Sequence, residues 1–117
     1  MLTATGFLFG NGVSIQGDLY TNPTAGTVLC DSGQLVGSNY LFGVIGYCSG
    51  TCTYDIEVRN AANTETLFYL RRLFSQGTDD FMFPNKLYIE QGQRIRVVLQ
   101  NNVSGDAMAC LFLLETG

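Results

Sequence analysis

Residues 53–59 read Thr-Tyr-Asp-Ile-Glu-Val-Arg, and their pattern is the clearest indication of the fold class. Every second side chain is apolar and those between are charged, which is the period of a β-strand with one buried face. The apolar set is Tyr54, Ile56 and Val58, and the charged set is Asp55, Glu57 and Arg59. We therefore predict a strand here, with the apolar set in a core and the charged set outside.

Similar short runs lie on both sides of this strand, separated by clusters of Gly, Asn, Asp and Ser. We expect further strands at residues 27–30, 34–36, 40–48, 86–90, 93–100 and 107–115, and a hairpin over residues 7–15. Residues 64–75 fit a helix or a strand, and the β-rich neighbours favour a long, bulged strand. The pattern predicts an all-β antiparallel sandwich, jelly-roll-like, of about eight strands.

The length of 117 residues allows one domain. We divide it into an N-terminal arm or hairpin, residues 1–17, and a β-sandwich, residues 18–117. The first residues do not read as a signal peptide, so we expect synthesis in a cytoplasm. The net charge of −4 argues against nucleic acid as a partner. No apolar run has the roughly 20 residues of a membrane-spanning helix, so we expect no membrane partner.

Two predicted strands are apolar on both faces, residues 40–48 and 107–115. Such strands are covered on both faces, and a sandwich core covers only one. The second cover is either a neighbouring subunit or the N-terminal hairpin. Only 14% of the residues are charged, which also indicates a surface partly covered by a partner.

Residues that carry chemistry are scarce. The chain has no histidine, which removes the commonest general base and metal ligand. Its carboxylates read as strand faces and turns, and we predict no catalytic, cofactor or metal site. A zinc site would need all four cysteines as ligands, and Cys30 and Cys110 stand alone in the sequence, which disfavours it. If residues 49–51 form a hairpin loop, Cys48 and Cys52 face each other and a disulfide can join them. The third reading is free, half-buried thiols.

A resemblance to a known family rests on two stretches, YLFGVIGYCSGTCTYDIEVRNAANTETL (residues 40–67) and FPNKLYIEQGQRIRVVLQNNVSGDAMACLFLLE (residues 83–115). Together they resemble head decoration (cement) proteins of tailed bacteriophages, which are small jelly-roll-like structural proteins. The resemblance implies a homotrimer on the capsid surface of the virion that clamps adjacent copies of the major capsid protein. It implies no catalytic residue.

Candidate contact residues follow from the enrichment of aromatic residues, methionine and arginine at interfaces. They are Phe7, Leu8, Phe9, Phe81, Met82 and Phe83 as apolar contacts, and Arg71, Arg72, Arg94 and Arg96 as ion-pair residues. For Phe81, Met82 and Phe83 a place in the core is an equal reading. The alternative function is a carbohydrate-binding or receptor-binding module of a phage fibre or tail, with the six tyrosines as a sugar platform. A catalytic role would require a deep pocket with two or more acids, which we expect to be absent.

Overall fold

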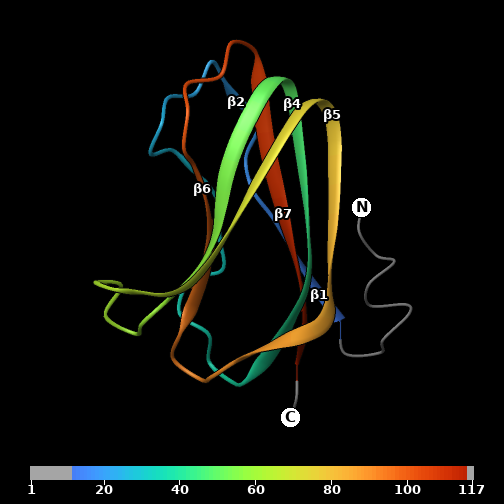
Figure 1. Cartoon of the computed structure of the whole chain (residues 1–117). Coiled ribbons are helices and arrows are strands. Elements are labelled where there is room, and N and C mark those ends of the chain that lie inside the picture. Colours follow the sequence, from blue (N-terminus) through green and yellow to red (C-terminus); the bar gives the residue numbers. More distant parts are fainter. Residues whose placement is uncertain (1–11, 116–117) are drawn as a thin grey trace.

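The fold is an antiparallel β-structure, built from residues 12–115, the part of the chain that this computed structural model describes (Figure 1). Its strands are β1 (Gly12–Gln16), β2 (Tyr20–Thr21), β3 (Val28–Asp31), β4 (Asn39–Arg59), β5 (Thr66–Ile89), β6 (Arg94–Leu99) and β7 (Asp106–Glu115). The predicted all-β class is confirmed. Within residues 12–115 no helix is long and apolar enough to cross a membrane.

Two long strands, β4 and β5, organise the fold, because they run side by side and bend over together (Figure 1). On its other edge, β4 pairs through residues 39–48 with β7 and through residues 54–59 with β6. The bend therefore divides the structure into two layers. In the first layer β1 and β2 pair with β7, followed by β4 and then residues 77–89 of β5; in the second, β3 pairs with β6, followed by β4 and then residues 66–75 of β5. A long hairpin folded over in this way gives the jelly-roll-like sandwich.

The core lies between the layers, and strand alternation decides which side chains enter it. The predicted inward set of residues 53–59 is confirmed, because Tyr54, Ile56 and Val58 are at most 4% exposed. In β7 the side chains that point into the core are small at the start of the strand and larger toward its end. They are Ala107, Ala109, Leu111 and Leu113. The small end leaves room for the Tyr54 ring, which also lies so close to Gly46 that a Cβ there would be 2.9 Å from it.

The hairpin loop considered for residues 49–51 is not formed, since β4 continues through them. Contacts from the β6–β7 loop hold this bend instead. The Asp106 N–H donates to Ser49 Oγ at 2.7 Å, and Gly50 lies so close to the Ser104 carbonyl that a Cβ would be 2.7 Å from that oxygen. These partners lie more than 50 residues further along the chain, so the local sequence alone could not indicate the bend.

Other predicted elements have mixed outcomes. Of the ambiguous residues 64–75, residues 66–75 belong to strand β5, as favoured, and β5 has register shifts against β4. Residues 34–36 are not a strand: Leu35 alone exchanges hydrogen bonds with residues 92–93, and Val36 is 90% exposed. The hairpin over residues 7–15 lies mostly outside the described residues. Its last part forms β1, which pairs with β7.

Candidate protein interface

The exposed apolar surface is concentrated on β5. Ten large hydrophobic side chains are exposed in the described part of the chain, and six of them belong to this one strand. They are Leu67, Phe68, Tyr69, Leu73, Met82 and Tyr88. Single exposed apolar residues are ordinary, but a row of them along one element marks an interaction surface. We therefore take β5 as the candidate site.

The second edge of β5 is also free to bond. β4 pairs with one edge over almost the whole length, and no other strand within residues 12–115 pairs with β5. The unpaired N–H and C=O groups of such an edge are a template for a further strand. The site thus combines apolar side chains with a row of backbone donors and acceptors.

The bend gives β5 two limbs, residues 66–75 and residues 77–89, which we call the first and second limb. The turn between them uses left-handed backbone at Gln76 (φ 26°) and Gly77 (φ 112°). The first limb borders the second layer and the second limb borders the first layer. Each layer therefore ends in a β5 edge.

The outer face of the first layer is apolar as well, as predicted for residues 40–48 and 107–115. Phe42 and Phe112 point away from the core and lie 6.3 Å apart between ring centroids, yet they are only 5% and 4% exposed. Tyr40 and Tyr88 form an edge-to-face pair at 5.5 Å. These rings continue the apolar surface of β5 onto β4 and β7.

The predicted ion-pair arginines are each engaged by a carboxylate of the same chain. The pairs are Arg71–Asp55 at 2.8 Å, Arg72–Asp79 at 2.7 Å, Arg94–Asp31 at 3.3 Å and Arg96–Glu57 at 2.7 Å. Three of them lie on the outer face of the second layer, where β3, β6, β4 and β5 carry alternating charges side by side. A contact between these arginines and another chain stays a prediction.

The fourth pair, Arg72–Asp79, joins the two limbs of β5 across the open side of the sandwich. The Arg72 guanidinium donates two hydrogen bonds to Asp79, at 2.9 and 2.7 Å, and lies 4.5 Å over the Phe81 ring. The fully buried Tyr54 donates its hydroxyl to the same carboxylate at 2.9 Å. The hydrogen bonds from Arg72 hold the pKa of Asp79 below its ordinary value, while burial raises the pKa of Tyr54.

The predicted apolar contact residues of β5 point to opposite faces, because successive side chains of a strand alternate. Phe81 and Phe83 pack against the core, 5.0 Å apart between ring centroids, whereas Met82 points outward and is 54% exposed. Met82 covers Gly43, where a Cβ would be 2.6 Å from its sulfur. The arm residues Phe7, Leu8 and Phe9 lie outside the described residues.

All four cysteines are free thiols in the structure, Cys48 and Cys52 included. These two lie on either side of the β4 bend and both point into the core. Burial raises the pKa values of Cys30 and Cys52 to about 12, so both thiols stay protonated at neutral pH. A protonated, buried thiol is a weak nucleophile.

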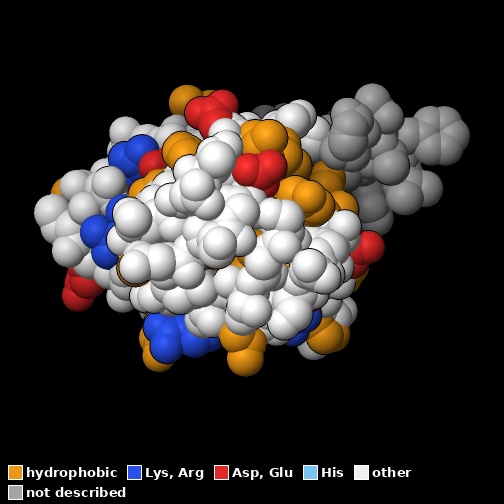
Figure 2. All heavy atoms as spheres, turned by 90° about the horizontal axis from the view of Figure 1, so that it is seen from above, with side chains coloured by type: hydrophobic (Ala, Val, Ile, Leu, Met, Phe, Trp, Pro, Cys, Tyr) orange, Lys and Arg blue, Asp and Glu red, His pale blue; other side chains and the backbone are white. Residues whose placement is uncertain are grey.

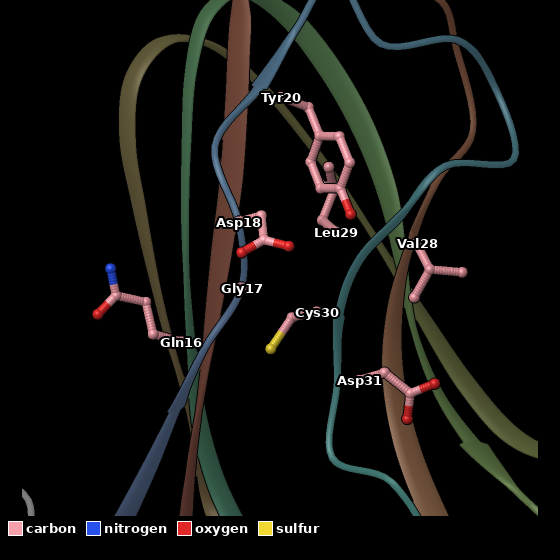
Figure 3. A pocket seen from close by; sticks show the side chains of 8 residues that line it. All are labelled: Gln16, Gly17, Asp18, Tyr20, Val28, Leu29, Cys30 and Asp31. Atoms are coloured by element: carbon pink, nitrogen blue, oxygen red, sulfur yellow. The ribbon is translucent and has the colours of Figure 1, made fainter.

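The seam where β3 approaches the segment between β1 and β2 holds a cavity of about 240 Å³ (Figure 3). Cys30 points into it and donates to the Ile15 carbonyl at 3.3 Å. Two acids, Asp18 and Asp31, are among its lining residues, but Figure 3 shows Asp31 on the opposite side of β3 from Cys30. No group of three or more metal-binding side chains occurs within the described residues.

The end of the molecule that carries the β4 and β5 bends is poor in charge. Figure 2 looks onto this end and shows mainly backbone and uncharged polar side chains, with some acidic and hydrophobic side chains among them and with lysine and arginine toward its margins. Its loops are held by amide side chains: Asn101 accepts from the Thr53 N–H and Asn102 from the Ala25 N–H, at 2.8 and 2.9 Å. The described hydrogen bonds of these loops therefore come mainly from amide side chains and backbone groups.

Comparison with known proteins gives few relatives. No family model and no curated protein matches the chain. Among solved structures, it is similar to the T13 viral particle of infectious bursal disease virus, with 13% identity over 89% of this chain and 31% of that one, and a TM-score of 0.37. The VP2 subviral particle of the same virus gives 18% identity, coverages of 87% and 28%, and a TM-score of 0.32. These neighbours are viral capsid structures rather than tailed-phage decoration proteins, this chain spans under a third of each, and TM-scores this low carry no argument about function.

Proposed function

We propose that this chain is a structural protein of a virion, which self-associates and attaches to the capsid surface as a decoration protein. The observation that carries the proposal is β5, a 24-residue strand with six exposed large hydrophobic side chains and an unpaired second edge within the described residues. Such a surface suits permanent burial in an assembly.

The ion pairs support a binding role rather than a catalytic one. Asp55, Asp79 and Glu57 each accept hydrogen bonds from an arginine at 2.7–3.0 Å, which fixes them as acceptors in strands. For Asp79 the hydrogen bonds from Arg72 lower the pKa, and a carboxylate with a lowered pKa is a poor general base. The proposed attachment requires no catalytic group: burial of apolar area supplies the energy, and repeated contacts around a shell add avidity.

The resemblance in the sequence implies three copies per oligomer and the major capsid protein as the partner, and both belong to this proposal. The alternative, a sugar-binding module, would use exposed tyrosines as a stacking platform. Tyr47 and Tyr88 lie toward opposite ends of the outer face of the first layer, and Tyr69 lies on the second layer. They do not form one platform, so the arrangement favours the structural role.

The test is the presence of the protein on intact particles. Gold-labelled antibodies against the purified chain are applied to virions whose genome encodes it, and the labels are located by electron microscopy. We expect labels on the outer capsid surface, and peptides of the chain in the mass spectrum of the same particles. Unlabelled particles that also lack these peptides would refute the proposal. A defined ligand on a glycan array would favour the sugar-binding alternative instead.

A further inference from the structure

The two limbs of β5 differ in how well their edges are protected against pairing. The second limb carries Asp79, Asp80, Pro84 and Lys86. Charges and proline on an edge strand discourage addition of another strand, because proline has no N–H to donate. The first limb, residues 66–75, has no proline, and its two charges, Arg71 and Arg72, are each paired with an aspartate of the same chain. The unprotected edge therefore belongs to the second layer.

The outward side chains of the first limb are Leu67, Tyr69, Arg71 and Leu73, as their pairing with β4 shows. Three of them are at least half exposed: Leu67 at 50%, Tyr69 at 59% and Leu73 at 70%. The Arg71 guanidinium, bound through two nitrogens to Asp55 at 2.8 and 3.0 Å, is held in place among them. This row offers an apolar surface with one fixed cation near its middle.

We propose that the first limb of β5 pairs antiparallel with the first limb of a second copy, around a two-fold axis at Leu70. The inference deepens the proposed function and rests on it, since it names the self-contact of the same site. In this register Leu67 lies opposite the partner's Leu73, and Tyr69 lies opposite the partner's Arg71. Directly opposed side chains lie about 5 Å apart and interact, and an arginine over a tyrosine ring is a favourable pair.

Neighbouring registers match less well. An axis at Arg71 would place the two Arg71 side chains directly opposite each other, and opposed like charges are destabilising. An axis at Tyr69 would set Arg71 against Leu67 and Leu73 against Glu65. Only the axis at Leu70 pairs leucine with leucine and the cation with an aromatic ring. The sequence of this limb is therefore self-complementary in one register, which points to a second copy as the partner.

The register is tested by cross-linking two single variants, Leu67→Cys and Leu73→Cys. Both positions are exposed, so the substitutions do not disturb the core. Mixed and mildly oxidised, the two variants should give a covalent dimer of twice 12.8 kDa on a non-reducing gel. Each variant alone is the control, because in this register two copies of residue 67 lie six residues apart, roughly 20 Å. No dimer in the mixture, or equal dimer in either variant alone, would overturn the proposal.

Light scattering after size exclusion provides a second readout on the unsubstituted chain. A two-fold contact predicts an even number of copies: two, or six where a three-fold contact also forms. Leu73→Lys should weaken this association at least about tenfold, whereas Val36→Lys, at a 90% exposed site away from β5, should not. A monomer or a trimer at every concentration would overturn the contact. If the antibodies label virions but the two cysteine variants give no mixed dimer, this contact is refuted and the proposed function stands. If the variants give the mixed dimer but virions are not labelled, the proposed function is refuted and the contact stands.

Discussion

The cluster of Tyr54, Asp79 and Arg72 holds the bent β5 strand closed, and removal of Asp79 tests this directly. Asp79 accepts two hydrogen bonds from Arg72 and one from Tyr54, at 2.7–2.9 Å, and its side chain is 11% exposed. Asp79→Ala leaves the Tyr54 hydroxyl without its acceptor in a fully buried position. It also leaves the Arg72 guanidinium without its counter-charge.

The expected loss of stability is about 3 kcal/mol. An unsatisfied buried hydroxyl costs about 1–3 kcal/mol, and hydrogen bonds to a charged group contribute about 1.5–3 kcal/mol. Loss of one partner of a fully buried ion pair costs about 3–5 kcal/mol. Arg72 keeps 32% of its side chain exposed and regains water when Asp79 is removed, which places the total at the lower end of that range.

Urea unfolding followed by circular dichroism and tyrosine fluorescence measures the free energy of unfolding. Asp80→Ala is the matched control, since Asp80 is the exposed neighbour on the same strand. Tyr54→Phe removes only the hydroxyl and should cost about 1–1.5 kcal/mol. If Asp79→Ala and Asp80→Ala unfold within about 0.5 kcal/mol of each other, a typical spread for surface substitutions, the cluster does not hold the limbs together.

Three further predictions follow from the same structure. Because its folded pKa is lowered, Asp79 stabilises the fold above the ordinary carboxyl pKa of about 4; the loss of stability as pH falls below about 4 should be smaller in Asp79→Asn, measured by urea unfolding at pH 7 and pH 3. Gly17→Ala should lower the melting temperature by more than about 8 °C, because a Cβ there would overlap the backbone carbonyl oxygen of Leu29, whereas Gly37→Ala, in open space, should change it little in the same thermal scan. Cys30 and Cys52 should react with a thiol reagent at pH 8 at least about a hundredfold more slowly in the folded than in the urea-unfolded protein; equal rates would contradict their burial.

The fold class could be predicted because apolar and charged side chains alternate strictly in residues 53–59. This alternation shows unambiguously which side chains face the core. The same argument could not orient residues 107–115, which are apolar on both faces. There the small residues Ala107 and Ala109 face inward, because the large Tyr54 ring from β4 fills the narrow end of the core. That choice depends on a neighbour more than 50 residues away.

The candidate site could be predicted only in part. Composition indicated a covered surface, and arginine and aromatic residues were sensible contact candidates. The ion-pair partners of Arg71 and Arg72 could not be predicted from the sequence. Asp55 lies on another strand, and Asp79 comes next to Arg72 only because β5 bends. The signal for β5 itself was present: residues 64–75 are apolar on both alternating positions, which is typical of a strand whose outer face is also covered.

The internal pairing of the arginines changes what a partner contact must rely on. An arginine already bound by a carboxylate at 2.7–3.0 Å gains little from exchanging that carboxylate for one on another chain. In the proposed contact, association then depends on apolar side chains and on the backbone edge of β5, where the first limb has no proline and both of its arginines are paired with aspartates of the same chain. The ion pairs fix Arg71 within that row, and it contributes as a placed cation for an aromatic ring rather than as a rim salt bridge. In the proposed contact, the scarcity of unpaired charge on this edge leaves apolar side chains and backbone hydrogen bonds to select a second strand of the same sequence.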